Sequence, residues 1–276
     1  MTFHYRRNSR GPLRAILLDW AGTTMDYGCM APAVVFMDVF KRRGVPITID
    51  EARAPMGAHK KVHIQRITEL ATVAERWRTT HGRAPGPKDV ASMFEQFVPL
   101  QVAVLSRYSK LIPGTLKVVD ACRKRRLKVG STTGYNTEMM RVNLRDAARQ
   151  GYVPDATVCA SDVPHGRPYP FMCLKNMIEL EVSPVEACVK VDDTLPGIEE
   201  GLNAGMWTIG LAVSGNEIGL PAAAVRKLAR ADYAARRDRA YGRMRQAGAH
   251  YVVDSIADIL PCLDDIERRL GAGERP

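Results

Sequence analysis

The sequence has no long apolar run. No segment approaches the roughly 18 consecutive apolar residues that a membrane-spanning helix needs, and the first ten residues contain no apolar signal core. We therefore expect no membrane partner and a location in the cytoplasm.

Closely spaced cysteine pairs are also missing. The chain has six cysteines, but none belongs to a C-x-x-C pair, which argues against a zinc site and against a disulfide framework. We expect most of them to be small buried apolar residues: Cys29, Cys122, Cys159, Cys173, Cys188 and Cys262.

Acidic residues are fewer than basic ones: the chain has 30 Asp and Glu and 40 Lys and Arg, which gives a formal net charge of +10. The excess is concentrated in residues 219–245. No nucleic-acid-binding motif accompanies this segment, so we interpret it as a solvated helix face and expect no nucleic-acid partner. If this basic segment has a function, we expect its positive charge to attract an anionic substrate.

Length and composition indicate a folded chain larger than one typical domain. The 276 residues are 46% hydrophobic and 25% charged, close to the averages of globular proteins. One core domain with a smaller inserted domain fits this length.

Short β-branched runs alternate with longer helical patterns, which is typical of an α/β fold with a parallel sheet. Ligands bind such sheets at the carboxyl ends of the strands. The predicted strands are residues 14–19, 127–131, 156–160, 187–191, 207–211 and 251–253.

The stretch between the first two predicted strands contains helical patterns and no convincing strand. Pro32 suits the first turn of a helix, and residues 44–46 contain the glycine and proline that end one. We predict an all-helical cap domain at residues 27–109, inserted in a core domain made of residues 1–26 and 110–276.

Four short motifs carry candidate chemistry. Asp19 ends an apolar strand and is followed by small residues, although a strand-end aspartate can also simply cap a turn. Thr133 follows the next strand, where backbone N–H groups can approach a phosphoryl oxygen, or where threonine serves as a helix N-cap. Arg167 can grip a phosphate with two parallel hydrogen bonds, and the pair Asp192-Asp193 offers the hard oxygen ligands that Mg²⁺ prefers.

In this order, the motifs resemble the haloacid dehalogenase superfamily. The resemblance implies a Rossmann-like parallel-sheet core of that type with a cap. It also implies that Asp19 attacks phosphorus, that the Ala21 carbonyl and Asp193 help Asp19 to bind Mg²⁺, and that Arg167 neutralises the reacting groups.

One departure from the superfamily concerns position 21. Phosphatases of the superfamily carry a second aspartate two residues after the nucleophile, whereas this chain has Ala21 and therefore lacks a general acid for a leaving alkoxide. Lys60 offers another way to stabilise a leaving group, because a lysine condensed with an aldehyde becomes an iminium, which accepts the electrons of the breaking bond.

The segments 19–32, 55–63, 131–135 and 167–170 look like those of the phosphonoacetaldehyde hydrolase family. This resemblance implies cleavage of the carbon–phosphorus bond of phosphonoacetaldehyde through a Lys60 Schiff base and an aspartyl phosphate, in a homodimer. It makes His63 a proton carrier near the site. It also implies a set of phosphate- or substrate-binding residues: Cys29, Met56, Gly57, Thr133, Gly134, Tyr135 and Arg167.

Several alternatives stay open. Lys61 adjoins Lys60, and on a helix only one of the two amines can face the site. The family often has an acid at the position of Gly197, so another acid has to serve here: Asp192, Glu199 or Glu200. A small-phosphate-ester phosphatase or mutase, and a non-catalytic interaction module that uses the basic segment, are the rival functions.

Overall fold

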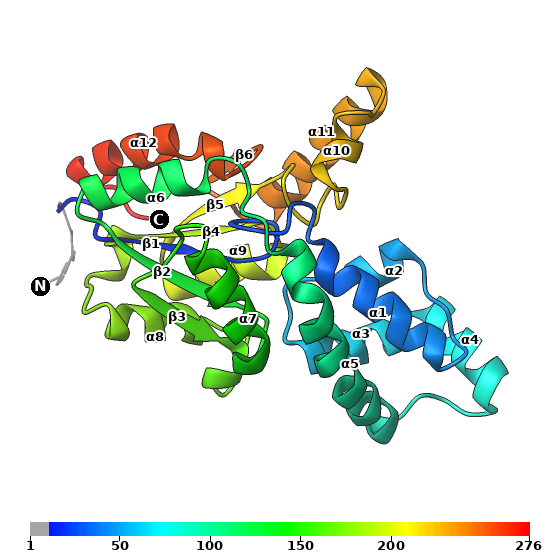
Figure 1. Ribbon diagram of the computed structural model, residues 1–276. Helices are drawn as coiled ribbons and strands as arrows, with labels where there is room; N and C mark the ends of the chain where they lie inside the picture. The colour runs from blue at the N-terminus through cyan, green and yellow to red at the C-terminus, as the bar shows by residue number, and fades with distance from the viewer. Residues whose placement is uncertain (1–10) are drawn as a thin grey trace, which may run out of the picture.

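A computed structural model describes residues 11–276, so the prediction made for the first ten residues lies outside the described part of the chain. Six parallel strands form one sheet in the order β3-β2-β1-β4-β5-β6 (Figure 1). This arrangement confirms the predicted α/β fold. The strands are β1 (Ala15–Leu18), β2 (Lys128–Thr133), β3 (Ala156–Cys159), β4 (Cys188–Asp192), β5 (Trp207–Leu211) and β6 (Tyr251–Val253).

The central strands are buried on both faces. All four residues of β1 are fully buried, as expected of an apolar strand between helix layers. Ile16 and Leu18 pack into one apolar cluster, while Ala15 and Leu17 pack into another. Figure 1 shows α6 (Thr115–Lys124) and α12 (Leu260–Gly271) over one face, and α8 (Phe171–Glu179) and α9 (Leu195–Ala204) over the other.

The strand register brings three chain segments to one edge of the sheet. Leu18 of β1 lies opposite Ser131 of β2 and Val191 of β4. The residues that follow these positions therefore meet at the carboxyl edge. α7 (Thr137–Ala148) begins shortly after β2, with Asn136 as its N-cap: the Asn136 side chain accepts from Met139 N–H.

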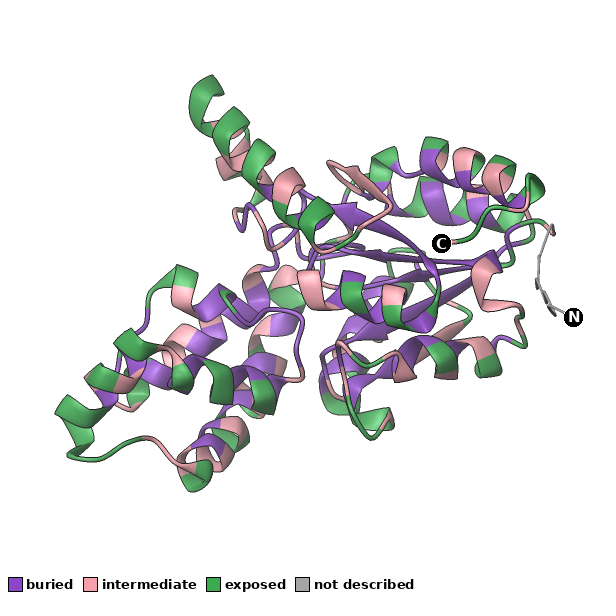
Figure 2. Cartoon of the chain, turned by 180° about the vertical axis from the view of Figure 1, so that it is seen from behind, coloured by how far each residue is buried: buried purple, intermediate pink, exposed green. Residues whose placement is uncertain are grey.

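Five helices lie between β1 and α6, beside the sheet (Figures 1 and 2). Within this group α1 and α3 pack mainly on α5, and α5 also packs on α7. Whether residues 27–109 form a separate domain stays a prediction. The helices are α1 (Met30–Arg42), α2 (Ile49–Arg53), α3 (Lys60–Glu69), α4 (Ala71–His81) and α5 (Pro87–Tyr108).

The basic segment forms α10 (Ala222–Val225) and the longer α11 (Arg230–Gln246). Only Ala240 and Met244 of α11 are buried, and Figure 2 shows exposed residues over most of its length. This agrees with the solvated helix that the sequence predicts.

The remaining elements are three short 3-10 helices, at Ala160–Asp162, Val185–Ala187 and Ile256–Asp258. None of the described helices is both long and apolar enough to cross a membrane. All six cysteines are buried and unpaired.

Candidate active site

A small cavity lies where the carboxyl edge of the sheet meets the loop before α3. Its volume is about 20 Å³, enough for about one water molecule. The structure brings ten of the twelve candidate residues to this cavity, and only His63 and Asp193 do not line it. The lining residues are Asp19, Ala21, Cys29, Met56, Gly57, Lys60, Thr133, Gly134, Tyr135, Arg167 and Thr194.

Asp19 directly follows β1 and is rigidly held. Its N–H donates to Val191 O at 3.1 Å, and the tight turn after it is closed by three N–H groups that donate to Trp20 O. Arg167 Nη2 donates to Asp19 Oδ1 at 2.6 Å. Burial raises the pKa of Asp19 to about 6, although the positive charge of Arg167 opposes this shift.

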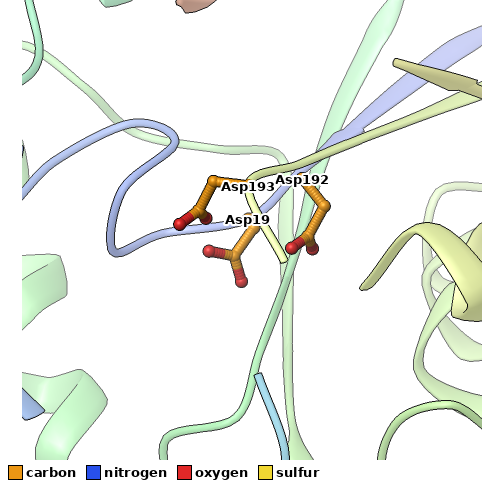
Figure 3. Close-up of side chains that lie close together, drawn as sticks. All are labelled: Asp19, Asp192 and Asp193. Carbon is orange, nitrogen blue, oxygen red and sulfur yellow. The ribbon is translucent and has the colours of Figure 1, made fainter. Parts of the chain in front are cut away.

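Three carboxylates, of Asp19, Asp192 and Asp193, each offer an oxygen within 4.8 Å of the others (Figure 3). Among the described residues, no Lys or Arg forms an ion pair with Asp193, which accepts hydrogen bonds only from Thr23 Oγ1 at 3.1 Å and Asn216 N at 2.8 Å. Burial and the two neighbouring carboxylates raise the pKa of Asp193 well above its usual value. A buried, oxygen-only cluster with an uncompensated carboxylate fits a divalent metal ion.

Arg167 belongs to a buried ionic network that sequence analysis resolved only in part. Its Nε lies 3.0 Å from Glu200 Oε2. Lys190, fully buried in β4, places Nζ 2.8 Å from Asp192 Oδ2 and 2.6 Å from Thr132 Oγ1. A lysine inside the apolar run of β4 was the available signal, because lysine is almost never fully buried without a partner.

Lys60, at the start of α3, is 5% exposed, whereas its neighbour Lys61 is exposed. Lys60 Nζ lies 4.8 Å from the ring centre of Tyr135 and 5.8 Å from that of Phe36. Burial lowers the pKa of the Lys60 ammonium, because the charged form loses its hydration there. The cavity therefore contains a buried amine close to Asp19.

His63 lies one turn after Lys60 but points into the helical layer. It is fully buried, its Nε2 is 2.9 Å from Ala52 O, and its ring stacks on Phe36 with centroids 3.8 Å apart. Burial, followed by the charge of Lys60, lowers the pKa of His63 well below its usual value. His63 does not line the cavity, and its part as a proton carrier stays a prediction.

Two glycines let the loop before α3 touch the core. A Cβ on Gly57, whose φ is +93°, would lie 2.5 Å from Thr194 Oγ1. A Cβ on Gly134 would lie 2.9 Å from Ala58 O. No larger side chain fits at either contact, so the loop is closed over the cavity.

Asp26 is a buried residue near the site to which sequence analysis gave no role. Its carboxylate accepts hydrogen bonds from Met30 N at 3.0 Å and Ala31 N at 2.8 Å, at the beginning of α1. The Asp26 N–H donates to Lys110 O at 3.1 Å. This hydrogen bond joins the segment that leads from β1 into the helical layer to the segment that leads from this layer to α6. Burial raises the pKa of Asp26 to about 7.

Comparison with known proteins identifies the family of the chain. Residues 13–205 match the haloacid dehalogenase-like hydrolases, and the chain belongs to that class. Curated relatives named phosphonoacetaldehyde hydrolase include one from Hahella chejuensis, 46% identical over 100% of this chain and 94% of the relative. Another, from Paraburkholderia phytofirmans, is 47% identical over 96% of this chain and 99% of the relative. Within its class, the chain is a member of the phosphonoacetaldehyde hydrolase family.

Solved structures give the same result. A crystal structure described as a phosphonoacetaldehyde hydrolase like protein, from Oleispira antarctica, is 44% identical and superposes with a TM-score of 0.97 over 100% of both chains. A β-phosphoglucomutase from Clostridium difficile is 15% identical with a TM-score of 0.68, over 93% of this chain and 98% of that one. At this identity, the second likeness concerns the fold alone.

Proposed function

We propose that the chain is a Mg²⁺-dependent phosphonoacetaldehyde hydrolase, which converts phosphonoacetaldehyde and water to acetaldehyde and phosphate. The observation that carries this proposal is that the amine of Lys60 and the carboxylate of Asp19, both buried, line one cavity. Residue 21, which lines the same cavity, is alanine and offers no acid. The relatives named for this activity support it over nearly the full length of the chain.

The amine activates the aldehyde carbon. Because the pKa of Lys60 is lowered, more of the amine is neutral and nucleophilic at a given pH than for an exposed lysine. It attacks the carbonyl, water leaves, and the protonated imine that forms can accept the electron pair of the carbon–phosphorus bond.

Asp19 then takes the phosphoryl group. One of its carboxylate oxygens attacks phosphorus in line, the carbon–phosphorus bond breaks, and its electrons move into the iminium to give an enamine on Lys60. A proton added to the enamine carbon regenerates an iminium, which water hydrolyses to acetaldehyde and free Lys60. A second water cleaves the aspartyl phosphate to phosphate and Asp19.

Electrostatics decide whether an anionic phosphonate can approach Asp19. Arg167 and the N–H groups around Thr133 and Gly134 offset the charge of the phosphoryl oxygens. A divalent ion held by Asp19, Asp193 and the Ala21 carbonyl would supply further positive charge there. Without these groups, two anions would repel each other at close range.

The substrate also needs space. A cavity of about 20 Å³ cannot hold a molecule with a phosphonate group and two carbons, so the loop around Gly57 has to move away from Thr194 before binding. Reclosure would exclude bulk water while the imine exists.

Phosphate release from phosphonoacetaldehyde, compared with release from a panel of small phosphate esters, tests this function. We expect turnover of the phosphonate and little of the esters, because Ala21 cannot protonate a leaving alkoxide. Preferential turnover of esters would favour the phosphatase or mutase alternative, in which Lys60 has no chemical part. Assembly as a homodimer is a further proposal, which light scattering of the purified chain tests.

A further inference from the structure

The loop that follows β5 contacts two segments near the cavity. Ser214 Oγ donates to Gly22 O at 2.9 Å, in the turn after Asp19. Ser214 O accepts from Gly28 N at 2.7 Å, in the segment that leads into α1. Sequence analysis gave residues 212–218 no role, yet this loop lies against both the turn after β1 and the beginning of the helical layer.

Two glycines bring the backbone of this loop against two buried charged side chains. A Cβ on Gly215 would lie 2.1 Å from Asp193 Cβ. The φ of Gly215 is outside the left-handed range, so this contact explains the glycine. A Cβ on Gly219 would lie 2.7 Å from Arg53 Nε. Since Gly219 N donates to Gly215 O at 3.0 Å, the two glycines close one turn that fits between Asp193 and Arg53.

Asn216, within this turn, contacts both charged side chains directly. Its N–H donates to Asp193 Oδ2 at 2.8 Å, and its Oδ1 accepts from Arg53 Nη1 at 3.1 Å. The other hydrogen bond that Asp193 accepts among the described residues comes from Thr23 Oγ1. The orientation of the Asp193 carboxylate therefore depends on where Asn216 is held.

Arg53 connects Asn216 to the loop that closes the cavity. It is the last residue of α2, four residues before Gly57, and it is 7% exposed. Its Nη1 and Nη2 also donate to Cys29 O at 3.3 Å and to Met30 Sδ at 3.1 Å, at the beginning of α1. Within the described part of the chain, the hydrogen bond to Asn216 is thus the one that joins the Arg53 guanidinium to the loop after β5.

We propose that Asn216 is a positioning residue that couples closure of the loop before α3 to the orientation of Asp193. While this loop is closed, Arg53 holds the Asn216 side chain, and the Asn216 N–H holds the Asp193 carboxylate. When the loop opens, Arg53 moves away and this support is lost. The proposal rests on the proposed function, in which the loop opens for the substrate and Asp193 helps to bind Mg²⁺.

Loop opening can be measured without substrate through Cys29, which lines the cavity and is 3% exposed. Its alkylation by iodoacetamide, followed by peptide mass spectrometry, should be about tenfold faster in Asn216→Ala, because a hydrogen bond to a charged group is lost. Asn216→Asp keeps an oxygen acceptor for Arg53 and should react as slowly as the natural chain. Cys173, fully buried in α8, is the control for global unfolding. Equal Cys29 rates in Asn216→Ala and the natural chain would overturn the role of this side chain.

Coupling to Asp193 is measured by calorimetric titration with Mg²⁺. Arg53→Met leaves Asp193 and its backbone donor in place, yet it should weaken Mg²⁺ binding about tenfold, as loss of a residue that supports a metal ligand commonly does. Adding Asn216→Ala should weaken binding little further, because both changes break the same contact. Arg53→Gln serves if Arg53→Met does not fold. Additive losses, or an unchanged affinity in Arg53→Met, would overturn the coupling.

The same titration separates this proposal from the proposed function. Absence of Mg²⁺ binding by the natural chain would overturn both. Binding that Arg53→Met and Asn216→Ala leave unchanged would overturn the coupling alone. Preferential turnover of phosphate esters, with Mg²⁺ affinity weakened in these variants as expected, would overturn the proposed function and support the coupling.

Discussion

Arg167 Nη2 lies 2.6 Å from Asp19 Oδ1, and both side chains are almost completely buried. In the proposed mechanism, the guanidinium would contact the nucleophile and the incoming phosphoryl group at once. The ion pair holds the carboxylate at the cavity, as the proposed in-line attack requires.

Asp19→Asn should abolish phosphate release, by at least about 10³-fold, because a neutral amide is a poor nucleophile of nearly the same shape. Imine formation on Lys60 does not need Asp19, so borohydride should still trap a substrate adduct. Both quantities can be measured on one sample, by phosphate assay and mass spectrometry. Substantial turnover by Asp19→Asn would exclude covalent phosphoryl transfer to this residue.

Metal removal should also stop turnover. EDTA is expected to abolish phosphate release and Mg²⁺ to restore it, because Asp193 has no other cation among the described residues. Asp193→Ala should raise the Mg²⁺ concentration needed for half-maximal rate at least about tenfold. Glu199→Gln, an exposed acid of α9, is the matched control and should behave like the natural chain. Full activity in EDTA would contradict the metal site.

Closure of the loop before α3 should depend on Gly57. Gly57→Ala would place a methyl group 2.5 Å from Thr194 Oγ1, so we expect kcat/KM to fall about 100-fold as the reacting groups are misplaced. Gly82→Ala is the control, since Gly82 also has a positive φ, of +68°, but nothing within 4 Å of the added carbon. If both variants lost activity equally, backbone strain rather than the contact with Thr194 would be responsible.

Adduct formation should depend on pH with a midpoint below the ordinary lysine value. Burial lowers the pKa of Lys60 from 10.5, so the reactive neutral amine appears as pH rises through this lowered pKa. The rate of borohydride-trapped adduct formation should therefore rise with pH and level off early. A midpoint at or above 10.5 would show that Lys60 is not desolvated in the working enzyme.

Much of the fold could be predicted because buried parallel strands are recognisable as short apolar runs. All six predicted strands exist, with β5 and β6 at the predicted bounds, and β2 two residues longer at its end. The position of Asp19 at the end of β1 followed from the same pattern. Strand ends of a parallel sheet meet at one edge, so Asp19, Thr133 and Asp193 could be grouped before their distances were known.

Contacts between distant segments could not be predicted in the same way. His63 shares a helix face with Lys60, but its ring stacks on Phe36 and does not line the cavity. The choice among Asp192, Glu199 and Glu200 needed the structure, which exposes Glu199 and buries the other two. The partnership of Lys190 with Asp192 and Glu200 likewise depends on how α9 packs on β4.

In the proposed mechanism, Lys60 activates the aldehyde and Asp19 accepts the phosphoryl group. Lys60→Arg keeps the charge but cannot form an imine, so it should lose nearly all carbon–phosphorus cleavage, whereas the exposed Lys61→Arg should retain it. The most direct measurement is peptide mass spectrometry after borohydride reduction in the presence of phosphonoacetaldehyde. We expect the adduct on Lys60 in the natural chain and in Lys61→Arg, and none in Lys60→Arg. An adduct on Lys61, or no adduct in a chain that hydrolyses phosphate esters, would contradict the proposed role of Lys60.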